Sequence, residues 1–309
     1  MKINIYGSTG IIGSKTLYVI KKYFPQIKVN LLCDNNNVNK LLKQINKFKP
    51  KYIYLNNLKK KNKLINNLPS NIKLLNYEDL KIYLKSSYSD LSLLAISGYK
   101  SLNYFDLILH NTNSIGLVSK ETIVSAGHLF KNLNQNKKIK IYPIDSEHFS
   151  IFNFINNSNK NLNITKVTLT ASGGPFLGKN FSSLREVSFN KASKHPKWKM
   201  GYKNSIDSAT LCNKCLELIE AHYLFNIPFN KLDIIIHPES KVHSIFEFKN
   251  YIYNMIYFHN DMNIPIYHFL NQKNQYNLDI KNYRFTKNQL LNFYDVENKQ
   301  FPIYKYFKK

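Results

Sequence analysis

Three carboxylates in two short polar segments have the residue types of a divalent-metal site. Asp145 and Glu147 lie two positions apart after an apolar stretch, and Glu217 lies downstream. Carboxylate oxygens are the hard ligands that suit Mg²⁺ or Mn²⁺. If Asp145 and Glu147 end a strand, both side chains lie on one face and can share a cation. On a helix, Glu217 shares a face with Asn213 and Lys214, although an ordinary surface ion pair also fits this spacing.

Small polar residues between these segments could hold a phosphate. Ser172 lies in a Ser-Gly-Gly-Pro turn, and Ser208 begins an expected helix at 208–225, where it could donate to phosphate oxygens or simply cap the helix. The segment from His195 to Gly201 also contains a tryptophan, and it could close over a ligand or bury the aromatic ring as an anchor. A metal and a phosphate in one chain indicate an enzyme.

A glycine-rich turn opens the chain. Residues 2–6 predict a buried strand, Gly-Ser-Thr-Gly-Ile-Ile-Gly follows at 7–13, and a helix is expected up to about Phe24. The glycine spacing matches the dinucleotide fingerprint only in part, but the strand before it and the helix after it are the right context for binding a pyrophosphate. A plain tight turn is the alternative. Asp34 stands about 20 residues further on, where an acid favours the 2′-hydroxyl of NAD.

Strands and helices continue to alternate, which predicts the fold class α/β. We expect a Rossmann-like, doubly wound and mostly parallel sheet in a first domain at residues 1–142, with ligands at the carboxyl ends of its strands. The character changes at about residue 145, and we expect a second, α+β domain at 143–280. Residues 281–309 carry little clear pattern and are interpreted as a linker or tail.

Composition narrows the class of protein. The net charge is +25, but only two of the 44 basic residues are arginine, the residue that nucleic-acid recognition favours. We therefore favour a biased genome as the cause of the lysine excess, and nucleic acid is an unlikely partner, although the charge would attract anionic substrates. Three cysteines are too few for a disulfide framework. With no signal peptide before the first strand and no apolar run long enough for a membrane, we expect a cytoplasmic protein.

Taken together, these segments resemble the 1-deoxy-D-xylulose 5-phosphate reductoisomerase family. The resemblance spans nearly all of the chain. Its segments, in chain order, are GSTGIIG (7–13), SKETIVSAG (119–127), PIDSEHFSIF (143–152), LTASGGPF (169–176), HPKWKMGYKNSIDSATLCNKCLELIEAHYLF (195–225), IIIHPESKVHSI (234–245) and DMNIPIYH (261–268).

The resemblance implies an activity and its cofactors. The expected reaction converts 1-deoxy-D-xylulose 5-phosphate to 2-C-methyl-D-erythritol 4-phosphate, in non-mevalonate isoprenoid biosynthesis. NADPH would supply the hydride, and Mg²⁺ or Mn²⁺, with Co²⁺ also possible, would hold the substrate oxygens. The first domain would bind NADPH, and the second would carry catalysis and form a homodimer.

The resemblance also implies roles for individual residues. The metal ligands would be Asp145, Glu147 and Glu217. The residues that contact the substrate would be Lys120, Ser146, Glu147, Ser172, His195, Ser208, Asn213, Lys214 and Glu217. The residues that line the coenzyme site would be Thr9, Gly10, Ile11, Ile12, Asn37, Ser119, Glu121 and Gly201. The segment at 195–203 would be the closing lid.

The sequence departs from the family pattern at several positions. Ser119 replaces a coenzyme-contacting asparagine, and Ser101 replaces a glycine. No basic residue follows Asp34 where the family often has one near the 2′-phosphate, so we hypothesise a weakened preference for NADPH. The family's C-terminal helical domain is expected to be missing. Two other functions stay open: a metal-independent Rossmann-type dehydrogenase with another substrate, and a basic RNA-binding protein on a decayed enzyme scaffold.

Overall fold

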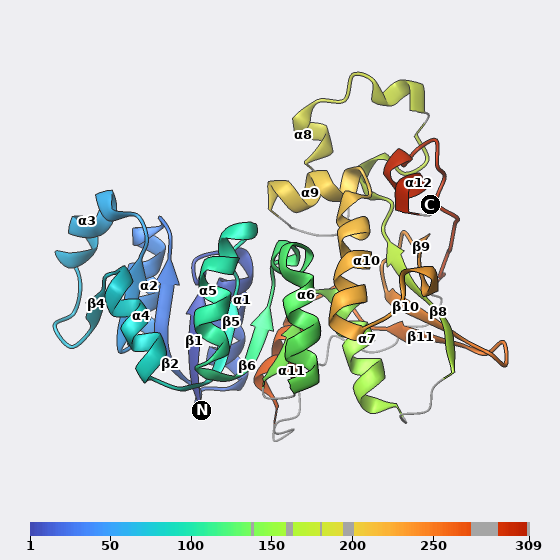
Figure 1. Ribbon diagram of the computed structural model, residues 1–309. Helices are drawn as coiled ribbons and strands as arrows, with labels where there is room; N and C mark the ends of the chain where they lie inside the picture. The colour runs from blue at the N-terminus through green and yellow to red at the C-terminus, as the bar shows by residue number, and fades with distance from the viewer. Residues whose placement is uncertain (137–138, 159–162, 180, 194–200, 273–289, 308–309) are drawn as a thin grey trace. The chain divides into compact units, whose positions relative to one another are not determined.

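The chain folds into two compact units in a computed structural model (Figure 1), which describes residues 1–136, 139–158, 163–179, 181–193, 201–272 and 290–307. The first unit contains Met1–Asp145 and the described residues from Met262 to 272. The second contains Ser146–Asp261 and residues 290–307. The predicted limits 1–142 and 143–280 differ from these units because the chain returns to the first unit at Met262.

The first unit is built on a seven-stranded sheet in which all neighbours are parallel. Its strands are β1 (Lys2–Tyr6), β2 (Lys28–Asp34), β3 (Tyr52–Leu55), β4 (Lys73–Leu75), β5 (Ser89–Leu94), β6 (Thr112–Leu117) and β7 (Lys140–Pro143). Their order across the sheet is β4-β3-β2-β1-β5-β6-β7. The winding direction reverses between β1 and β5, and in such sheets ligands bind beyond the carboxyl ends of the strands at this point.

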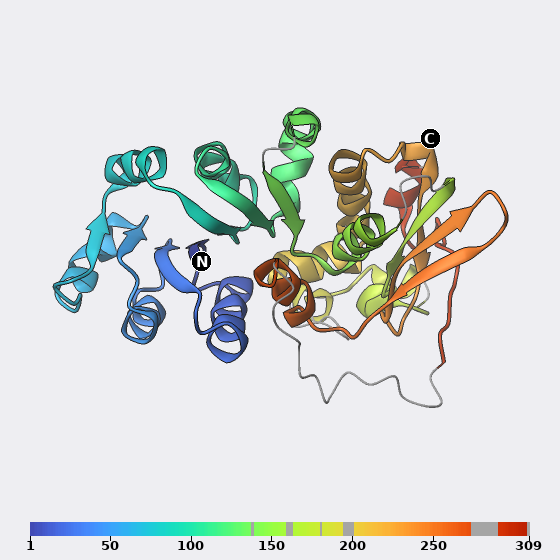
Figure 2. The ribbon, with the colours of Figure 1, turned by 90° about the horizontal axis from the view of Figure 1, so that it is seen from below.

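Helices cover both faces of this sheet, so its strands are buried on both sides. The helices of the unit are α1 (Ile11–Tyr23), α2 (Val38–Phe48), α3 (Lys61–Ile65), α4 (Tyr77–Ser86), α5 (Leu102–Leu109), α6 (Lys120–Asn136) and α11 (Asn263–Leu270). Figure 2 shows α1 and α2 on one face and α4, α5 and α6 on the other. The α/β, doubly wound fold that the alternating pattern predicted is therefore confirmed.

Helix α11 belongs to the first unit because its aromatic side chains complete that core. The Tyr267 ring lies 5.1 Å from the ring of Phe24, which follows α1. Phe269 is fully buried, and its ring lies 5.7 Å from that of Tyr142 in β7. A β-carbon on Gly116 in β6 would lie 2.9 Å from the Phe269 ring, so the small residue makes room for it.

The second unit has a mixed four-stranded sheet. Its strands are β8 (Ile164–Ala171), β9 (Leu232–Ile236), β10 (Val242–Phe248) and β11 (Tyr253–Tyr257), in the order β11-β10-β8-β9. Strands β8 and β9 are parallel, and the other pairs are antiparallel. The helices are α7 (Ser146–Asn157), α8 (Phe189–Ala192), α9 (Tyr202–Ala209), α10 (Cys212–Phe225) and α12 (Pro302–Phe307). Apolar residues of α7, α10 and α12 share one buried cluster with the sheet.

Two local predictions are wrong. The helix expected at 208–225 begins at Cys212, because Leu211 has a left-handed backbone (φ 63°) that separates α9 from α10. Ser208 therefore lies in the last turn of α9 and caps no helix. Asp145 and Glu147 do not share a strand face either, because α7 begins at Ser146 and places Glu147 in its first turn. There the helix dipole favours negative charge.

Within the described ranges, no helix is both long enough and apolar enough to cross a membrane.

Candidate metal and coenzyme site

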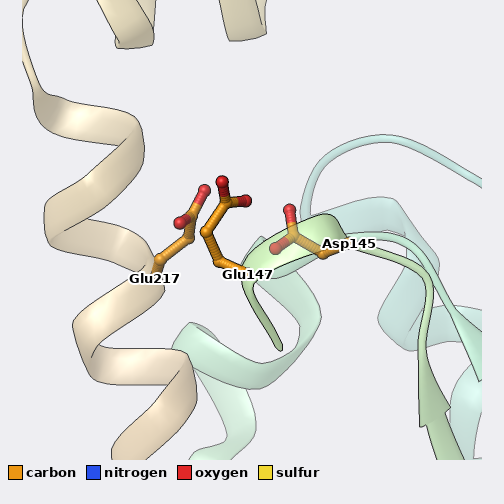
Figure 3. A group of neighbouring side chains, drawn as sticks. All are labelled: Asp145, Glu147 and Glu217. Atoms are coloured by element: carbon orange, nitrogen blue, oxygen red, sulfur yellow. The ribbon is translucent and has the colours of Figure 1, made fainter. Parts of the chain in front are cut away.

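The three predicted metal ligands converge (Figure 3). Asp145 lies where β7 leads into α7, Glu147 lies in the first turn of α7, and Glu217 lies on α10. One carboxylate oxygen from each residue lies within 4.8 Å of the others. A single cation placed among three oxygens this close can bind all of them. The donor set of three carboxylates is one that Mg²⁺ and Mn²⁺ prefer.

Two lysines lie beside the three carboxylates. The Lys214 ammonium lies 2.5 Å from Glu217 Oε2 and 3.4 Å from Glu147 Oε1, and the Lys120 ammonium forms an ion pair with Asp145. The Glu217 side chain is only 1% exposed. The surface-pair reading of Lys214 and Glu217 therefore does not hold. Three negative charges face two positive ones, so the cluster keeps a net negative charge that favours a cation.

Neighbouring polar groups orient the carboxylates. The Asn213 side-chain amide donates to Glu217 Oε1 at 2.5 Å, one helical turn away, as the predicted helical face requires. The Ser146 hydroxyl donates to Glu147 Oε2 at 2.8 Å. These bonds hold the side chains where a metal and a substrate oxygen could meet them.

A buried histidine links the two helices that carry Glu147 and Glu217. His148 has no exposed surface, and its Nε2 lies 2.9 Å from the backbone oxygen of Glu217. Its Nδ1 lies 3.3 Å from Glu220 Oε2. The sequence analysis assigned no role to Glu220. The available signal was its position three residues after Glu217, which places it near the same helical face.

The Ser-Gly-Gly turn lies against the end of α9. Gly173 and Gly174 both have positive φ (81° and 69°), which glycine adopts without strain. A β-carbon on Gly174 would lie 2.9 Å from the Ser208 backbone oxygen. The turn thus brings Ser172 near Ser208, two of the residues expected at the phosphate. His195, also expected at the phosphate, lies outside the described residues, as does the lid segment up to residue 200.

The glycine turn after β1 is a tight backbone loop that opens α1. Gly7 has φ 84°, and a β-carbon on Gly13 would lie 2.3 Å from the Gly7 backbone oxygen, so only glycine fits at either position. Gly10 is the N-cap of α1. Thr9, Gly10, Ile11 and Ile12 therefore lie where backbone amides of a helix N-terminus point outward, which suits a pyrophosphate.

The carboxylate of Asp34 accepts hydrogen bonds from its own loop and from the glycine turn after β1. The Thr9 hydroxyl donates to one oxygen, and the backbone amides of Asn36 and Asn37 donate to the other at 3.0 and 2.7 Å. Asp34 is 8% exposed. Asn37 is the N-cap of α2, where its side chain accepts a hydrogen bond from the backbone amide of Lys40. The acid therefore shapes the loop and does not point outward toward a ribose.

Ser119, the residue that replaces asparagine, holds Glu121 in place. Its hydroxyl lies 2.8 Å from Glu121 Oε2 and 3.3 Å from the Gly98 backbone oxygen. Ser101, the other replacement, lies nearby, where its hydroxyl donates to the same Gly98 oxygen at 2.7 Å. These residues follow β5 and β6 at the edge where β1 ends. Gly201, by contrast, is the exposed N-cap of α9 in the second unit.

Comparisons with known proteins point to one family. A family model described as 1-deoxy-D-xylulose 5-phosphate reductoisomerase matches residues 3–127, and a model of the C-terminal domain of that enzyme matches residues 141–225. The enzyme of that name from Sulfurihydrogenibium sp. (strain YO3AOP1) is 39% identical over 99% of this chain and 78% of its own length. The one from Pelagibacter ubique is 37% identical over 98% of this chain and 79% of its own length.

Solved structures give the same result. A reductoisomerase in complex with NADPH, fosmidomycin and magnesium matches with a TM-score of 0.87 and 29% identity, over 100% of this chain and 78% of that chain. The reductoisomerase from Zymomonas mobilis in complex with NADPH matches with a TM-score of 0.83 and 28% identity, over 99% of this chain and 79% of that chain.

Thiol reactivity will report whether α10 is packed as described. Burial raises the pKa of the Cys215 thiol to about 12 and also raises the pKa of Cys33, and both side chains are buried. The thiolate is the reactive form, and only about 10⁻⁴ of Cys215 is thiolate at pH 8, so its labelling should be slow. We expect iodoacetamide to modify half-buried Cys212 first, as read by peptide mass spectrometry. Equally fast labelling of Cys215 in native and urea-unfolded protein would contradict this packing.

Proposed function

This chain belongs to the 1-deoxy-D-xylulose 5-phosphate reductoisomerase family, and we propose that it converts 1-deoxy-D-xylulose 5-phosphate to 2-C-methyl-D-erythritol 4-phosphate. The reductant is NADPH and the metal is Mg²⁺ or Mn²⁺. The observation that carries this proposal is the convergence of Asp145, Glu147 and Glu217 within 4.8 Å. The family membership and the glycine turn before α1 support the coenzyme.

The carboxylates fit the proposed metal by their chemistry and by their number. Asp145, Glu147 and Glu217 would supply hard oxygen donors to such an ion. When bound, the ion polarises the substrate carbonyl and stabilises negative charge that develops on oxygen. The nearby lysines do not block this role, because an ammonium on a flexible stem can move aside.

The residues of the chain hold the substrate around this centre. The ammonium groups of Lys120 and Lys214 are donors for substrate oxygens, and they lie beside the carboxylates that would hold the metal. Ser146 orients Glu147, which faces the same region. Toward the other end of the substrate, Ser172, Ser208, Asn213 and His195 contact the phosphate. Gly173 and Gly174 in the turn at that end have no side chains to cover their backbone amides.

The reaction needs a bond rearrangement followed by a hydride transfer. The resemblance implies retro-aldol and aldol steps, in which a hydroxyl loses a proton and a carbonyl gains one. Lys120, Lys214 and the three carboxylates are the ionisable groups in position to hold or move these protons. The coenzyme, held by the turn after β1, would supply the hydride that reduces the aldehyde. The residues proposed for the coenzyme, apart from Gly201, follow β1, β2 and β6, at the carboxyl edge of the first sheet.

The other candidate functions find less support. A metal-independent dehydrogenase would have no use for three carboxylates that converge. An RNA-binding protein would not need a buried carboxylate with lysine and asparagine partners.

The cytoplasmic location stays a prediction.

Substituting Glu217 will test the proposed function. Glu217→Gln keeps the size of the side chain but removes a metal ligand, so we expect kcat to fall by at least about 100-fold, as when another transition-state stabiliser is lost. The assay uses deoxyxylulose phosphate, NADPH and Mn²⁺ and follows nicotinamide absorbance with product identification. EDTA should stop turnover by the native protein.

The matched control for this variant is Glu78→Gln, which changes an exposed glutamate on α4. The control should retain native turnover. Native-level activity of Glu217→Gln, or turnover that EDTA leaves unchanged, would refute the proposed role of the metal.

The geometry of the Asp34 loop revises the coenzyme hypothesis. Its carboxylate accepts two bonds inside the loop and one from Thr9 in the glycine turn, so it does not offer an oxygen to the 2′-hydroxyl of NAD. The Lys60 ammonium lies 3.4 Å from the Asn36 backbone oxygen, and the Lys40 ammonium lies 2.7 Å from the Thr9 backbone oxygen. Two positive charges therefore flank the loop where a 2′-phosphate is expected. We propose that NADPH is preferred over NADH.

We expect Lys60→Ala to reduce this preference. The exposed Lys60 side chain would make a charge-assisted bond to the 2′-phosphate, worth about 1.5–3 kcal/mol, so kcat/KM for NADPH should fall about tenfold or more. The kcat/KM for NADH should stay the same. The control Lys85→Ala, at an exposed position of α4, should leave kcat/KM unchanged for both coenzymes. Equal kcat/KM for both coenzymes in the native protein would contradict the proposal.

The edge of the second sheet is a candidate surface for the homodimer. Strand β11 is the edge strand, and its Ile256 packs toward the core. Tyr253 and Met255 alternate with it and are about half exposed, and Ile252 and Tyr251 before the strand are exposed as well. Apolar side chains beside an unpaired strand edge favour association with a second copy.

Light scattering will check the homodimer. The native protein should elute with twice the mass of one chain, and Met255→Lys should shift it toward the monomer because a charge would be buried at the interface. Leu58→Lys, at an exposed site in the first unit, is the control and should leave the dimer intact. A monomeric native protein at micromolar concentration would exclude the proposed dimer.

A further inference from the structure

A buried histidine–glutamate pair lies beside the carboxylate cluster. His148 has no exposed surface, and the Glu220 side chain is 3% exposed. The His148 ring also stacks on Phe225, with centroids 6.3 Å apart. Burying an ionisable pair is costly unless hydrogen bonds and geometry compensate. Such a pair therefore calls for a reason beyond packing.

The contacts of the ring couple the two helices that carry metal ligands. His148 follows Glu147 in the first turns of α7. Its Nε2 lies 2.9 Å from the backbone oxygen of Glu217 on α10. One ring thus joins the residue next to one proposed ligand with the backbone of another. Its orientation helps to set how far apart Glu147 and Glu217 lie.

The protons on the two ring nitrogens of His148 show how Glu220 holds the ring. The Glu217 carbonyl oxygen can only accept, so Nε2 must carry a proton. Nδ1 faces Glu220 Oε2 at 3.3 Å, an ion-pair distance. Nδ1 and the carboxylate oxygen attract each other when one proton lies between them, bound either to Nδ1 or to the Glu220 carboxylate. Glu220 therefore fixes the orientation of the ring from the side opposite to Glu217.

We infer that Glu220 is a positioning residue for the metal centre: through His148 it holds α7 and α10 at the spacing that lets Glu147 and Glu217 bind one ion. Glu220 itself binds neither metal nor substrate in this role. The inference rests on the proposed function, since it assigns a metal to the three carboxylates. Outer partners of this kind typically change metal affinity 10–100-fold when they are removed.

A matched pair of substitutions isolates the hydrogen-bonding role. Glu220→Gln and Glu220→Met both remove the charge and nearly conserve the volume. The glutamine amide can donate to Nδ1 while Nε2–H still donates to the Glu217 oxygen, whereas the methionine thioether offers no donor. An apolar residue of similar size in place of a buried ion is often tolerated by the fold. Any difference between the two variants therefore reports the bond to His148.

The primary readout is Mn²⁺ affinity without substrate, measured by electron paramagnetic resonance of the free ion. We expect Glu220→Met to weaken Mn²⁺ binding about 10–100-fold and Glu220→Gln to stay within about threefold of the native value. Ile234→Val, a buried change in β9 of the same unit, should bind Mn²⁺ as the native protein does. If Glu220→Met does not fold, Glu220→Ala replaces it in the comparison.

The outcomes separate this inference from the proposed function. Equal Mn²⁺ affinity in the Gln and Met variants overturns the positioning role, even when the native enzyme turns over deoxyxylulose phosphate. Weaker binding only in the Met variant supports it, whatever substrate the native protein accepts. Failure of native turnover with intact Mn²⁺ binding counts against the proposed reaction alone.

Discussion

The arrangement of the site depends on the repulsion among three carboxylates that share a small volume. Asp145, Glu147 and Glu217 place oxygens within 4.8 Å of one another, and Glu217 is almost fully buried. Like charges this close are costly in a medium of low polarity. Lys120 and Lys214 offset part of that cost, and a divalent ion would offset the rest. The fold therefore holds a strained arrangement of charge that binding of a cation relaxes.

Regular helices place the three carboxylates and their polar partners in this arrangement. Asp145 and Glu147 lie at the N-terminus of α7, where the helix dipole favours negative charge. Spacing along α10 brings Asn213 and Lys214 beside Glu217. His148 ties the two helices together from behind. At the carboxyl edge of the first sheet, glycine turns replace side chains with backbone amides.

Local signals in the sequence sufficed for much of this structure. The strand, glycine turn and helix at the start of the chain were predicted because each depends on neighbouring residues. The convergence of Asp145 and Glu147 was predicted too, but from a strand that is in fact the start of a helix. The return of α11 to the first unit and the role of Glu220 were not predicted. Both depend on contacts between distant segments, such as Phe269 with Tyr142 and Glu220 with His148.

The most direct test of the central claim is the position of the ion itself. Crystals of the native protein soaked in Mn²⁺ should show one strong anomalous-scattering peak bonded to oxygens of Asp145, Glu147 and Glu217, at about 2.0–2.2 Å if it keeps Mg²⁺-like geometry. A peak bonded to other residues, or no peak at saturating Mn²⁺, would contradict the account.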